Sequence, residues 1–153
     1  MPGYKGHLAG GLITGGILLY AVQELNPTPL TALEWLSFAL AGSLFPDIDI
    51  KSKGQKLFYP ILLGILVLLF YNGHIELVAL LAVLGLVPMM VRHRGVFHRL
   101  WFVIIFPLFV ASVGALLMPE CMRIFFLDTL FFIAGAISHL WLDFGTMRML
   151  RGK

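Results

Sequence analysis

Seven histidines and aspartates could bind a divalent metal ion if the fold gathers them in one place. His139 and Asp143 are four residues apart, so on a helix they share a face with Cβ atoms about 5–6 Å apart. Imidazole and carboxylate donors suit zinc best here, with manganese or iron as alternatives, whereas calcium and magnesium prefer oxygen ligands. The complete set of candidate ligands is His7, Asp47, Asp49, His93, His98, His139 and Asp143.

Two short segments carry the other paired ligands. Pro46 disfavours a helical conformation at the residue before it, and in an extended segment alternate residues share a side. We therefore expect Asp47 and Asp49 to form a non-helical pair of carboxylates directly after Pro46. His93 and His98 are five residues apart, which no single helix face accommodates, so both can turn inward only around a tight reversal in the chain. The glycine between them, at position 95, permits such a reversal.

The candidate ligands exceed what one tetrahedral ion needs and fit one or two divalent ions. Metal ions lower the pKa of bound water and stabilise negative charge in a transition state, which predicts hydrolysis of a phosphoester. Asp49 or Asp143 could also accept a proton. Arg94, Lys53 and Ser52 lie in the same loops and are candidates for substrate binding, although Lys53 fits equally well as an ordinary membrane-flanking cation.

The elements that must position these residues are apolar helices. Of 153 residues, 59% are hydrophobic and 12% charged, against about 45–50% and about 25% in soluble domains. The formal charge of +3 comes without a basic helix face or stacking platform, so we expect no nucleic-acid partner. The sequence predicts an all-α, polytopic membrane helical bundle, a single domain over residues 1–153. Its six transmembrane or partly re-entrant helices are expected at residues 8–22, 30–45, 57–71, 75–91, 100–118 and 124–142.

The positively charged residues and the candidate metal ligands are both expected mainly on one face of the membrane. If the six segments cross alternately, ten of the eleven lysines and arginines fall on the side of the N-terminus. The positive-inside rule places that side in the cytoplasm, so we expect both termini there. All seven candidate ligands fall on this same side. Ionisable groups within the hydrocarbon cost about 2.5–3.5 kcal/mol each, so we expect them to share a cavity or a metal.

Four motifs in this chain resemble those of the YdjM-type, LexA-regulated, membrane-bound metal-dependent hydrolases. The resemblance covers nearly the whole chain in order, and it implies an inner-membrane protein with a divalent-metal hydrolase site, distantly similar to zinc-dependent phospholipase C. The family commonly has threonine and serine where this chain has Phe97 and Arg99, which leaves the substrate open. The motifs are Gly6-His7-Leu8, Pro46-Asp47-Ile48-Asp49 within residues 42–55, His93-Arg94-Gly95 with His98, and Ser138-His139 with Asp143 and Thr146.

We therefore expect a hydrolase that cleaves a phosphoester of a lipid or lipid-linked substrate at the cytoplasmic face. A site embedded in the bilayer can meet such a substrate laterally. The alternative is a non-enzymatic metal-ion carrier or transporter that uses the same cluster. Transporters place their sites near the bilayer midplane, often between inverted repeats, whereas these residues lie toward one face and the sequence shows no repeat.

Overall fold

The computed structural model describes residues 3–48, 52–90 and 96–151 of the chain. The predicted all-α bundle is confirmed, because these residues form six α-helices and no strand, and each predicted segment corresponds to one helix. Short 3-10 helices occur at η1 (Gln23–Leu25), η2 (Phe45–Asp47), η3 (Val96–His98) and η4 (Pro119–Cys121). The α-helices are α1 (Tyr4–Ala21), α2 (Pro29–Leu44), α3 (Lys53–Tyr71), α4 (Ile75–Met90), α5 (Leu100–Leu117) and α6 (Met122–Arg151).

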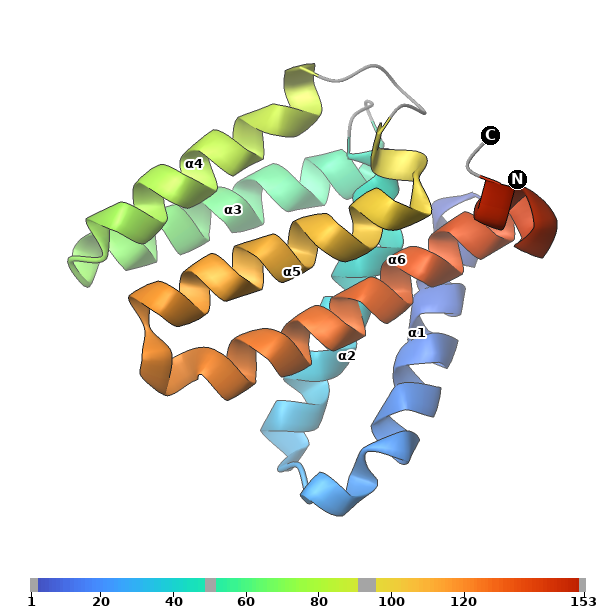
Figure 1. The fold of residues 1–153 in the computed structure, drawn as a ribbon, viewed down its shortest axis with the longest axis horizontal. Coiled ribbons are helices and arrows are strands. Elements are labelled where there is room, and N and C mark those ends of the chain that lie inside the picture. The colour runs from blue at the N-terminus through green and yellow to red at the C-terminus, as the bar shows by residue number, and fades with distance from the viewer. Residues whose placement is uncertain (1–2, 49–51, 91–95, 152–153) are drawn as a thin grey trace.

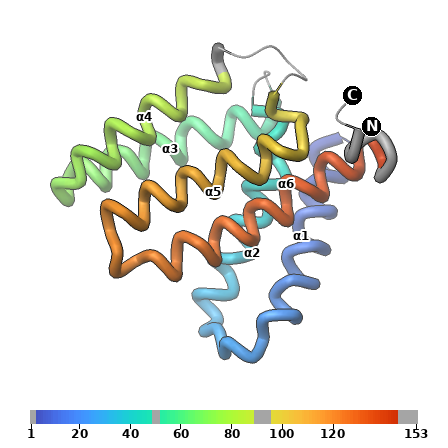
Figure 2. The backbone as a smooth tube through the Cα atoms, in the orientation of Figure 1, coloured from blue at the N-terminus to red at the C-terminus, as the bar shows by residue number. Residues whose placement is uncertain are grey.

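The helices form three antiparallel hairpins, α1–α2, α3–α4 and α5–α6 (Figures 1 and 2). Helix α2 packs most extensively on α6, α1 packs on both of these helices, and α5 packs on α6, so that the four helices form the core. The α3–α4 hairpin packs mainly on itself and touches the core only lightly. The start of α1, the end of α2, the starts of α3 and α5, and the far end of α6 all lie at one end of the molecule (Figure 1).

Within the described ranges, three helical segments are long and apolar enough to cross a membrane: Lys53–Tyr71, Leu100–Leu117 and Pro119–Gly145. Helix α4 is also apolar over Ile75–Pro88 but is shorter than a typical span. Large apolar side chains are exposed on these helices, which is what contact with lipid requires of the outer surface of a membrane protein. Membrane embedding is therefore supported, and the crossing of α1, α2 and α4 and the side of the termini stay predictions.

The crossing of α2 and α6 depends on two glycines. A Cβ atom on Gly42 would collide with the carbonyl oxygen of Phe132, and one on Gly135 would collide with the carbonyl oxygen of Ala39. Small residues at such crossings let helix backbones approach closely within a membrane. The close approach sets the last turn of α2 directly against the part of α6 that carries His139.

Candidate metal centre

Helix α6 supplies two of the predicted ligands from one face. His139 and Asp143 are four residues apart, and the His139 Nε2 atom lies 3.6 Å from Asp143 Oδ2. The His139 side chain is completely buried and that of Asp143 is 7% exposed. The predicted pairing of these two side chains on one helix face therefore agrees with the structure.

The segment around Pro46 differs from the prediction. We expected an extended pair of carboxylates, but Phe45 is helical (φ −60°, ψ −43°) and Phe45–Asp47 continues α2 as the 3-10 helix η2. Proline is tolerated in the first turn of a helix, because its missing N–H is not needed there. Both Phe45 and Pro46 are buried, which offsets the steric cost of a helical residue before proline. Asp49, the other member of the expected pair, lies outside the described residues.

A backbone carbonyl that the sequence analysis did not identify orients His139. The Nδ1 atom of His139 lies 2.7 Å from the carbonyl oxygen of Ser43 in the last turn of α2. Since a carbonyl only accepts, Nδ1 must carry the hydrogen, and in the neutral ring Nε2 is left with its lone pair. Metal-binding histidines typically donate their other ring N–H in this way. The signal in the sequence is Pro46, which removes the N–H donor three residues after Ser43.

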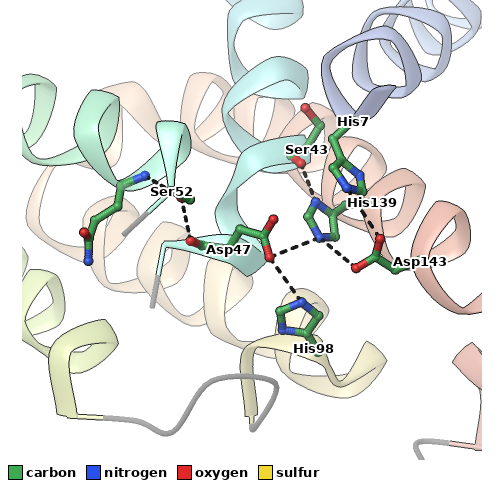
Figure 3. A network of polar contacts seen from close by, with 8 residues as sticks. His7, Ser43, Asp47, Ser52, His98, His139 and Asp143 are labelled. Carbon is green, nitrogen blue, oxygen red and sulfur yellow. Dashed lines mark hydrogen bonds and ion pairs between the residues drawn. The ribbon is translucent and has the colours of Figure 1, made fainter. Parts of the chain in front are cut away.

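Three other side chains meet His139 at this end of the bundle (Figure 3). His98 Nε2 and His139 Nε2 lie 3.5 Å and 3.7 Å from the same oxygen, Asp47 Oδ1. His7 Nε2, from the first turns of α1, lies 3.4 Å from Asp143 Oδ1. The His7 and His139 rings are stacked, with centroids 3.8 Å apart and an interplanar angle of 16°. Five of the seven predicted ligands are thus brought together from four elements, α1, η2, η3 and α6.

The donor atoms form two overlapping groups that could each hold a metal ion. One is His7, His139 and Asp143, and the other is Asp47, His98 and His139, with the donor atoms of each group within 4.8 Å of one another. Both groups contain His139, whose Nε2 atom has a single lone pair. Both can therefore be filled only around one shared ion, and a second ion would need ligands beyond these five.

The surroundings of the donor atoms fit a bound cation. His139 Nε2 and Asp143 Oδ1 are buried, and neither has a hydrogen-bond partner within the part of the chain that the structure describes. Buried polar groups are rarely left this way, because an unsatisfied donor or acceptor costs about 1–3 kcal/mol. A lone pair that faces two carboxylates is also electrostatically unfavourable unless a proton or a metal ion lies between them. The residues present therefore fit a divalent metal ion.

Asp47 marks the accessible side of the cluster. Its side chain is 29% exposed, whereas those of His7 and His98 are 4% and 3% exposed. Burial raises the pKa of the Asp47 carboxyl, but the hydrogen bond from His98 and the charges of His139, His98 and His7 outweigh it and hold the pKa below its ordinary value. Asp47 therefore remains an ionised carboxylate at the point where an external molecule can reach the cluster.

The remaining predicted site residues lie apart from this cluster or outside the described residues. Ser52 caps α3, since its Oγ atom accepts a hydrogen bond from Gln55 N at 3.0 Å and donates to the Asp47 carbonyl oxygen at 2.8 Å. Lys53 is exposed at the start of the same helix. Their roles in substrate binding stay predictions. His93 and Arg94, together with Asp49, are in the segments that the structure does not describe.

The variant Ser52→Ala tests whether Ser52 acts through the fold or on the substrate. We expect it to lower the free energy of unfolding by about 1 kcal/mol, the usual cost of losing a helix cap, with unchanged metal content. Thermal unfolding in detergent and metal analysis measure both quantities. Ser37→Ala, at an exposed hydroxyl within α2, is the matched control. A raised KM for a phosphoester without a loss of stability would instead assign Ser52 to substrate binding.

Comparison with known proteins identifies the family of this chain. The model of the YdjM inner membrane protein family matches residues 1–150, a range that contains every candidate ligand. No curated protein and no solved structure matches the chain.

Proposed function

Since the chain belongs to the YdjM inner membrane protein family, we propose that it is a membrane-bound metal-dependent hydrolase that acts on a phosphoester. The observation that carries the proposal is the His139 Nε2 atom, which is buried between the carboxylates of Asp47 and Asp143. This arrangement could hold a cation, and the partly exposed side chain of Asp47 supports access of a substrate to it. The substrate class favoured by the membrane setting is a lipid or a lipid-linked phosphoester.

The distances between donor atoms are compatible with zinc, which we propose as the metal because of the imidazole and carboxylate donors. Zinc bonds of about 2.0–2.2 Å in a tetrahedron separate neighbouring ligand atoms by about 3.3–3.6 Å. The pairs within the cluster are separated by 3.4, 3.5, 3.6 and 3.7 Å. Manganese and iron accept the same donors, and metal analysis of the purified protein distinguishes the three.

In the proposed hydrolysis, the side chains of the cluster have two roles, which are to position the ligands and to transfer a proton. A bound divalent ion would supply the acidity that activates water near neutral pH and the positive charge that stabilises a developing oxyanion. Asp143 holds His7 and His139 in place, and its buried Oδ1 atom can accept the proton of the attacking water. The water oxygen joins phosphorus, the phosphorus–oxygen bond to the alcohol breaks, and the leaving oxygen takes up the proton that Asp143 accepted from the water.

The test is hydrolysis by the purified, metal-loaded protein of a soluble phosphodiester and of phospholipids. We expect Asp143→Asn, which keeps the shape of the side chain, to lower kcat by about 10²-fold or more, the scale of a lost acid–base group. Glu76→Gln is the control, because Glu76 is exposed in the first turn of α4, next to the turn that joins α3 to α4. Stoichiometric metal without turnover, together with metal flux into vesicles, would overturn the hydrolase and favour the carrier.

A further inference from the structure

An apolar cavity of about 200 Å³ lies between the α3–α4 hairpin and the four-helix core. Apart from Thr129, all the side chains that line it are apolar, and they come from α2 with η2, α3, α4, α5 and α6. Such a lining offers almost no hydrogen bonds, so water is a poor occupant. The residues that matter for the argument are Phe45, Phe58, Leu62, Leu84, Val110 and Phe132.

The 3-10 helix η2 contributes one residue to the cavity and one to the metal centre. Phe45 lines the cavity, and two residues later Asp47 presents the exposed carboxylate of the cluster. The ring centroid of Phe45 lies 5.1 Å from that of Phe132, which also lines the cavity. It lies 5.3 Å from the ring centroid of Phe97, which is completely buried. Aromatic contacts therefore connect the cavity lining to Phe97, which precedes the candidate ligand His98 in the sequence. A molecule that spans both regions needs an apolar tail and a polar head.

We propose that this cavity binds one acyl chain of a phospholipid whose phosphoester head lies at the Asp47 side of the metal centre. Two observations select a lipid chain over other apolar ligands. Helices α3, α5 and α6, which contribute three sides of the cavity, are the segments long and apolar enough to cross a membrane, so bilayer hydrocarbon lies beside them. The candidate cation site, to which η2 also contributes, matches the negative charge of a lipid phosphate. That this lipid is a substrate rests on the proposed function, but acyl-chain binding does not.

Photolabelling tests the acyl site without any need for turnover. The probe is phosphatidylglycerol with a diazirine near the end of one acyl chain, added to the metal-loaded protein in detergent and mapped by mass spectrometry. We expect saturable labelling of cavity residues such as Leu62 and Val110. Leu84→Trp, which fills the cavity from α4, should reduce this labelling about tenfold, as expected for the lost burial of a few methylenes.

Two further variants keep the result interpretable. Leu86→Trp is the matched control, because Leu86 lies on the same helix with its side chain 56% exposed and does not line the cavity. Val110→Phe narrows the cavity from α5 and replaces Leu84→Trp if that variant does not fold, as judged by metal content. Labelling confined to exposed residues such as Leu86, or unchanged by both cavity variants, would overturn the proposal.

Hydrolysis of two substrates separates this inference from the proposed function. If the acyl site is correct, Leu84→Trp slows cleavage of a long-chain phospholipid and leaves a soluble phosphodiester unaffected. Specific labelling without any hydrolysis would retain the acyl site and reject the hydrolase. Equal cleavage of the long-chain lipid by the parent protein and Leu84→Trp would retain the hydrolase and reject the acyl site.

Discussion

We expect the variant His139→Ala to lose the proposed metal binding and, with it, the proposed hydrolysis. His139 is the one residue shared by both donor groups, so its removal leaves neither group complete. We expect the metal affinity to fall by more than about 10³-fold, beyond the 10–100-fold typical for loss of a supporting residue outside the ligand shell. Calorimetric titration with Zn²⁺ and metal content after dialysis measure this effect.

Two comparisons make the His139 result specific. His7→Ala removes a donor from only one group, so we expect weaker metal binding but not its loss. His74→Ala is the control, because His74 lies at the turn between α3 and α4, away from the cluster. Full zinc occupancy in folded His139→Ala would exclude the centre described here.

The second large effect is expected from Gly135→Ala. The added Cβ atom collides with the Ala39 carbonyl oxygen, so α2 and α6 must move apart. Overpacking of an interior typically costs about 1–3 kcal/mol, and we expect at least that loss in the free energy of unfolding. The same shift displaces the Ser43 carbonyl from His139 Nδ1, so metal content should fall together with the midpoint of thermal unfolding.

The control for this variant is Gly16→Ala. Gly16 lies on α1, and a Cβ atom there would meet nothing within 4 Å. Alanine favours helix over glycine, so this variant should be as stable as the parent or slightly more stable. If Gly135→Ala and Gly16→Ala have equal stability and metal content, the prediction is wrong. The metal centre would then not depend on the close approach of α2 and α6.

The helices could be predicted from the sequence because their apolar runs are long and bounded by turn-forming residues. Asn26-Pro27-Thr28-Pro29 and Asn72-Gly73 separate helices in the structure as they do in the hydropathy pattern. The joint role of His139 and Asp143 was also predictable, because a spacing of four residues fixes a shared helix face. Local rules were sufficient where the relevant residues are close in sequence.

The finer geometry of the site was not predictable, because it depends on how the helices cross. The helical conformation at Pro46 follows from burial of Phe45 in the assembled core, which outweighs the local preference. The bond from His139 to the Ser43 carbonyl joins residues 96 positions apart and depends on the close approach at Gly42 and Gly135. The sequence does not show how closely two helices approach each other. For the same reason it did not predict that His139 belongs to both donor groups.

The distribution of the donors along the chain has a consequence for biosynthesis. His7 on α1 leaves the ribosome well before His139 and Asp143 on α6. The pocket therefore cannot close around an ion until α6 has been made and has packed against α1 and α2. A metal ion bound by this cluster would therefore join α1 to α6 only after both helices have been made.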